Sequence, residues 1–164
     1  MPSEMTLEST AQTVLSATLE SLRLGERPLV VVPTQGPMIR RNRYWSEGDD
    51  RPAQTRIEHE VADLLVDRGC ASGALATVDV LAWDGSHVGL DHEDSANIAA
   101  VVVLFDVPGS IFDVYELPLC RSSEGWQIRE TVRPLPTGPG EGVPGSVLFA
   151  ELSNAVVDDR SSLS

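Results

Sequence analysis

The segment Ile98-Ala-Ala-Val-Val-Val-Leu-Phe-Asp106 is an almost unbroken apolar run, and it points most directly to the fold class. A strand covered on both faces reads as such a run, whereas a half-exposed strand alternates apolar and polar residues. The run therefore predicts a central strand. The turn Pro108-Gly109 leads to a strand at 111–119, and the turn at 122–125 leads to another at 126–132. Strands separated by short turns predict an antiparallel meander.

The strands before this run are predicted from the alternation of apolar and polar residues and from the positions of prolines. Residues 74–83 alternate with a period of two, and Asp84-Gly85 is a hairpin signal that returns the chain through 86–90. The β-branched run from Pro28 to Pro33 is bounded by prolines, which is typical of a strand at the edge of a sheet. A further strand is expected at 38–45.

Three helices are expected, at 5–24, 52–68 and 146–158, from helical spacing and end signals. The chain is thus predicted to be α+β. A mostly antiparallel, curved sheet of four to six strands would be packed on one face by two helices from the N-terminal half, with a short C-terminal helix after a Pro/Gly-rich loop. Residues 1–133 are expected to form a single domain, 134–145 the loop, 146–158 the helix and 159–164 a tail.

The charge balance excludes several classes of function. Twelve basic residues, all of them Arg, oppose 25 acidic ones, which gives a net charge of −13. Without Lys there is no Gly-Lys-Ser/Thr phosphate loop and no Schiff-base chemistry. Nucleic acid and anionic membranes attract a positive surplus, so neither is expected as a partner. The lack of a long apolar segment and of an export signal favours the cytoplasm, where Cys70 and Cys120 are expected to be reduced and buried.

Titratable residues cluster around the predicted hairpin. His87 and His92 are the candidates for a metal site, but their spacing matches no metal motif, and the solvated hairpin and loop account for these polar residues without a metal. No cofactor is expected. Asp79 interrupts the strand at 74–83. If its face is covered, the carboxylate would lie in an apolar pocket as a general base, whereas a face open to water makes it an ordinary surface residue.

A basic patch stands out in this acidic chain: Arg40, Arg41 and Arg43 beside Tyr44 and Trp45. Guanidinium groups bind carboxylates and phosphates, and aromatic rings offer stacking surfaces. These five residues form the candidate ligand- or partner-binding site. The alternative is that the Arg residues pair with the chain's own carboxylates, such as Asp49, Asp50 and Glu58.

Residues 100–134 resemble the closing strands of the NTF2-like (ketosteroid-isomerase-like) superfamily. The shared pattern is two long strands, a Ser-Ser-Glu-Gly turn at 122–125 and a strand that begins with Gly-Trp-Gln-Ile at 125–128. The resemblance implies a cone built from N-terminal helices and a curved sheet, with an apolar pocket that often holds an Asp. The strand at 29–32 and the helix after Pro144 depart from that pattern.

Two functions are open on this reading. The first is a non-enzymatic accessory or interaction protein (chaperone-, immunity- or adaptor-like) that binds a protein partner, expected to be basic, through an acidic surface. The alternative is an NTF2-like pocket protein acting as an isomerase, a cyclase or a small-molecule carrier, with Asp79 as general base. No catalytic motif favours an enzyme. A homodimer is compatible with the edge strand and the C-terminal helix.

Overall fold

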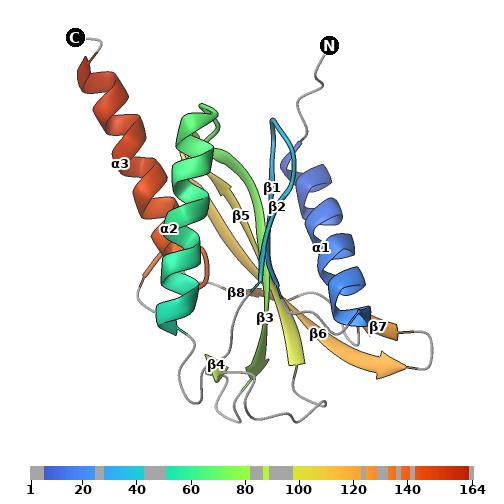
Figure 1. Cartoon of the computed structure of the whole chain (residues 1–164). Helices are drawn as coiled ribbons and strands as arrows, with labels where there is room; N and C mark the ends of the chain where they lie inside the picture. Colours follow the sequence, from blue (N-terminus) through green and yellow to red (C-terminus); the bar gives the residue numbers. More distant parts are fainter. Residues whose placement is uncertain are drawn as a thin grey trace.

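Helices on both sides of an antiparallel sheet make up the fold (Figure 1). The computed structural model describes residues 6–24, 28–42, 51–81, 87–88, 98–122, 125–128, 133–135, 138–140 and 143–162. Its helices are α1 (Leu7–Arg23), α2 (Arg51–Asp67) and α3 (Ser146–Ser162). Its strands are β1 (Pro28–Pro33), β2 (Ile39–Asn42), β3 (Ser72–Leu81), β4 (His87–Val88), β5 (Ile98–Asp106), β6 (Ile111–Ser122), β7 (Gly125–Ile128) and β8 (Arg133–Leu135). The α+β class and the predicted antiparallel sheet are confirmed.

β3 and β5 lie in the middle of the sheet. The strand order is β2-β1-β3-β5-β6-β7, with β4 paired to β3 and β8 paired to β6. All of these pairs are antiparallel. In the middle of β5, Val102 lies opposite Ala76 of β3 on one side and Tyr115 of β6 on the other. The apolar run at 98–106 is therefore a central strand, as predicted.

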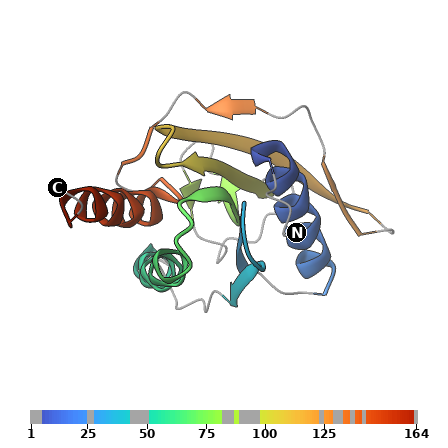
Figure 2. The same cartoon turned by 90° about the horizontal axis from the view of Figure 1, so that it is seen from above.

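Each face of the sheet carries its own apolar core, because successive side chains of a strand point to opposite faces. On one face, α1 places Val14 against Val30 and Ala76. On the other face, α2 and α3 cover Val31 and Leu75. Figures 1 and 2 show the sheet between α1 on one side and the α2/α3 pair on the other.

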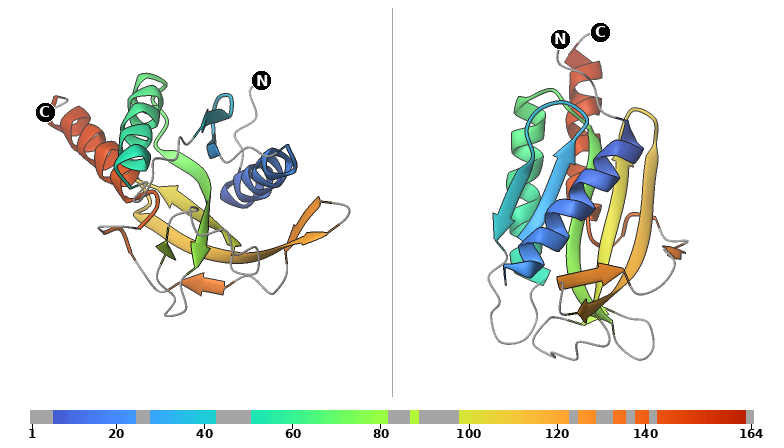
Figure 3. Two further views of the ribbon diagram at one scale, coloured as in Figure 1. Left: turned by 60° about the horizontal axis from the view of Figure 1, so that its bottom comes forward. Right: turned by 90° about the vertical axis from the view of Figure 1, so that its right-hand side faces the viewer.

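The arrangement corrects the expectation that the helices pack on one face. The residues of β1 and β5 are apolar at nearly every position, so both faces of these strands need cover, and helices from different parts of the chain supply it. It also differs from the cone that the NTF2-like resemblance implies. Away from the centre, the sheet curves: β6 and β7 bend toward α1, and β7 contacts that helix (Figure 3).

Three further features differ from the predictions: the position of one strand and the bounds of two elements. β1 is not an edge strand, since β2 covers its outer side and its prolines stand only at the two ends. β8 occupies the start of the predicted 134–145 loop, because a strand at the sheet's margin can pair on one side only and tolerates Pro134. α3 continues to Ser162, beyond the expected end at 158.

Candidate functional site

The solvent side of α2 carries a row of carboxylates. Glu60, Asp63 and Asp67 are spaced by three and four residues, so they share one side of the helix, and all three are exposed. We call these three residues the α2 acidic surface. Arg56, also exposed, lies one turn before Glu60 on the same side. Because the buried residues of α2 face the sheet, the row is presented to solvent.

Exposed apolar side chains accompany this row. Val66, next to Asp67, is 44% exposed, and Met38, just before β2, is 40% exposed. The two segments are tied together by Arg68, whose Nη1 donates a hydrogen bond of 3.0 Å to the carbonyl oxygen of Pro37. The C-terminal end of α2 and the loop before β2 thus form one region that combines negative charge with accessible apolar surface.

β2 connects this region to the basic residues picked out in the sequence. Arg41 lies opposite Leu29, on the α2 side of the sheet, and its Nε is 3.7 Å from Oε2 of Glu60. Arg40 lies opposite Val30, on the α1 side, and is exposed. The two guanidinium groups therefore stand on opposite faces of the sheet.

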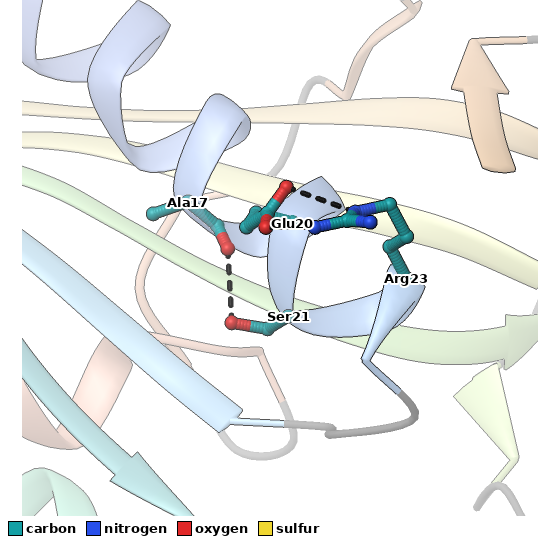
Figure 4. Close-up of polar contacts among 4 residues, drawn as sticks. All are labelled: Ala17, Glu20, Ser21 and Arg23. Atoms are coloured by element: carbon teal, nitrogen blue, oxygen red, sulfur yellow. Dashed lines mark hydrogen bonds and ion pairs between the residues drawn. The ribbon is translucent and has the colours of Figure 1, made fainter. Parts of the chain in front are cut away.

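On the α1 side, Arg40 contributes to a second group of charges. Glu20 accepts hydrogen bonds from Nε and Nη2 of Arg23, one turn later in α1 (Figure 4). This hydrogen bonding is the main reason that the pKa of Glu20 is lowered, and the positive charges of Arg23 and Arg40 lower it further. Pairing with the chain's own carboxylates, the alternative weighed for the Arg residues, occurs for Arg41, whose partner is Glu60.

The other predicted site residues are described only in part. Arg43, Tyr44, Trp45 and His92 lie outside the described residues. For Asp79 and His87 the backbone alone is described: Asp79 lies opposite Ala99 in the middle of the sheet, and His87 lies opposite Leu81 in the β3–β4 hairpin. Within the described part of the chain, no group of three His, Cys, Asp or Glu side chains is placed to hold a metal ion.

Cys70 is buried and unbonded to another cysteine, as predicted. Its thiol lies 3.3 Å from the carbonyl oxygen of Ser72 and 3.7 Å from Oγ1 of Thr34. The hydroxyl groups of Thr34 and Ser72 share a hydrogen bond of 2.6 Å. These contacts tie the end of β1 to the start of β3, so we assign them a role in the fold. The side chain of Cys120 lies outside the described ones.

The pairing of α2 with α3 depends on polar contacts that the sequence does not reveal. Glu58 is 2% exposed, and its Oε1 accepts a hydrogen bond of 3.1 Å from the backbone N–H of Leu148, in the first turn of α3. One residue further on, Nδ1 of His59 lies 2.7 Å from Oε1 of Glu151. Glu58 therefore acts as a cap for α3 that is supplied by another helix.

Two further buried polar residues lie on the α2/α3 face of the sheet. Thr77 of β3 and Glu116 of β6 are both register partners of Val101 in β5, and they are 0% and 7% exposed. Helical spacing in the predicted helix at 52–68 could have revealed the α2 acidic surface. No sequence signal could have revealed the Thr77–Val101–Glu116 row, because it depends on strand register.

Fold and surface together define a three-layer α+β protein with an open antiparallel sheet and an acidic outer helix. Comparison of the chain with family models, with curated proteins and with solved structures finds no match. None of the helices among the described residues is both long and apolar enough to cross a membrane.

Proposed function

We propose that this chain is a non-enzymatic accessory protein of the cytoplasm, chaperone-, immunity- or adaptor-like, that binds a basic protein partner through the α2 acidic surface. The observation that carries this proposal is the row of three exposed carboxylates on one side of α2. The net charge of −13 adds a long-range attraction that speeds the encounter with a positively charged protein.

Apolar surface beside the charges supports binding of a protein over simple counterion binding. Interfaces combine an apolar centre with a polar rim, and charged rims mainly set the partner and the association rate. Val66 and Met38 supply accessible apolar side chains, and the acidic row lies beside them. Arg41, paired with Glu60, holds one end of the row against β2.

The same charge argues for a different partner over a second copy of the chain. Two α2 acidic surfaces would repel each other across a two-fold axis. A homodimer would need another surface, such as the outer side of β2, which is unpaired among the described residues. Light scattering of the purified chain and of Asp63→Asn/Asp67→Asn separates these cases: an oligomeric state that the two substitutions leave unchanged fits the proposal, and a dimer that forms only when these charges are present contradicts it.

Charge-matched variants test the role of α2. The probe is a synthetic amphipathic peptide with Arg along one face and Leu along the other, titrated by calorimetry at low salt. Asp63→Asn/Asp67→Asn removes two negative charges from α2, and the dissociation constant should rise by about 2- to 30-fold, from roughly 0.2–1 kcal/mol per exposed charge pair. Glu8→Gln/Asp113→Asn removes two exposed charges elsewhere and should have a much smaller effect. Equal effects of the two variants would show attraction by net charge alone and would contradict a site on α2.

A further inference from the structure

We propose that the α2/α3 face of the sheet holds a binding site for a small organic cation, an amine or guanidinium group on an apolar body, with the carboxylate of Glu116 as its anchor. The site is independent of the α2 acidic surface. It rests on the position of Glu116 in the sheet, on its burial and on the lack of a polar partner for it among the described side chains.

Glu116 lies in the interior of the sheet, between β5 and β8. Its register partners are Val101 of β5 and Arg133 of β8. In β6 it follows Val114 by two residues, so the two share the face that α2 and α3 cover. The next residue on this face is Pro118, which is also buried and lies opposite Ala99.

Glu116 is buried and has no polar partner among the side chains that the structure describes. The residue is 7% exposed, and no hydrogen bond or ion pair to it is found within the part of the chain that the structure describes. Burying an ionised carboxylate away from water is costly unless donors surround it.

The surroundings of Glu116 are apolar, with one hydroxyl nearby in the same row. Leu75, Val103 and Val114 are register partners across β3, β5 and β6, and this set, on the side toward α3, is apolar. In the set that contains Glu116, Val101 lies between Glu116 and Thr77. The backbone of Asp79 lies one row further on, opposite Ala99. A ligand bound here would contact apolar side chains and would find a hydrogen-bond acceptor in the carboxylate of Glu116.

The chemistry of the anchor selects the ligand. An ionised carboxylate only accepts hydrogen bonds, so it favours a donor that carries positive charge, and an amine or guanidinium group meets that requirement. Apolar neighbours such as Val101 and Pro118 favour a ligand with an apolar body over a hydrated inorganic ion. A divalent cation would require several oxygen ligands, and Glu116 is the single carboxylate described in its row.

The test uses benzylamine, with benzyl alcohol and benzoate as neutral and anionic probes of similar size. Benzylamine should shift the amide resonances of Thr77, Val101 and Glu116 and raise the melting temperature, and the other two probes should do neither. Glu116→Gln should abolish both effects. Asp113→Asn, an exposed carboxylate of the same strand, should retain them, and so should Asp63→Asn/Asp67→Asn.

Stability provides a readout that does not need the ligand. Glu116→Gln replaces a buried carboxyl group that has no partner among the described side chains by an amide of the same shape, so this variant should raise the melting temperature by about 2–4 °C. The proposal is overturned if Glu116→Gln lowers the melting temperature and Arg133→Gln has no additional effect in that background. Glu116 would then be the internal partner of Arg133. It is equally overturned if benzylamine perturbs Glu116→Gln and the unmodified chain alike.

Discussion

At the residue scale, Gly73 shows how closely β1 and β3 approach. It lies opposite Pro33, next to the hydrogen bond between Thr34 and Ser72 that joins the two strands. A Cβ at this position would lie 2.8 Å from Cα of Pro33 and closer still to the carbonyl oxygen of Val32. Both contacts are with backbone atoms, which cannot move aside as a flexible side chain can.

Gly73→Ala should therefore destabilise the fold by about 1–3 kcal/mol, the range for overpacking an ordered site. Urea unfolding followed by circular dichroism measures the change. Gly138→Ala is the matched control, because nothing lies within 4 Å of its added Cβ, and its stability should stay near that of the unmodified chain. If the two variants are equally stable, the strands are further apart than described.

Glu20 gives a second prediction at this scale. Its carboxylate is held by Arg23, so its pKa should lie below the ordinary value near 4.5, and Arg23→Gln should raise it toward that value. Carbon-detected NMR of the carboxyl group measures both. A pKa that is lowered in the folded state means that the pair stabilises the fold above the unfolded pKa, and that this contribution is lost as the pH falls through the folded pKa. The side chain of Glu20 is exposed to solvent, so the contribution should be small.

At the scale of elements, sequence patterns locate most helices and strands but not their partners. The run at 98–106 and the prolines at 28 and 33 give the bounds of β5 and β1 as observed, and the helix predicted at 52–68 is displaced by one residue. The edge position predicted for β1 is wrong, because prolines at the ends of a strand leave its interior N–H groups free to pair on both sides. Pairing is a non-local property that one strand's sequence does not encode.

The contact between α2 and α3 yields the prediction for this scale. Glu58→Ala leaves the buried N–H of Leu148 without its acceptor, so the free energy of unfolding should fall by about 1–3 kcal/mol. Hydrogen exchange should locate the loss in the first turn of α3. Asp63→Ala, in the same helix but exposed, should cost far less. Similar losses for both variants would contradict the capping role of Glu58.

At the scale of the whole molecule, the two cores should contribute separately to stability. Leu119 is fully buried on the α1 side, and Leu65 is fully buried between α2 and the sheet. Truncation of either to Ala should cost about 2–5 kcal/mol, as for other buried leucines. Leu24→Ala should cost little, because Leu24 is 59% exposed. A tolerated change at Leu65 or Leu119 would show that one face lacks the packing described.

The two candidate sites differ in how far they could be predicted from the sequence. The net charge and the helical spacing of Glu60, Asp63 and Asp67 are visible in the sequence, so an acidic helix was within reach of prediction. Arg40 and Arg41 read as one patch in the sequence, yet consecutive strand residues point to opposite faces. Glu116 becomes notable only once three strands bring it beside Val101 and bury it.

The most direct test of the proposed function is to map the basic peptide probe on the isotope-labelled chain by amide chemical shifts at low salt. We expect the largest shifts on residues 59–67 of α2 and on 38–41, with little change along α1 or in β6. These shifts should disappear in Asp63→Asn/Asp67→Asn. Shifts spread evenly over all exposed carboxylates, or centred on α1, would contradict a partner-binding surface on α2.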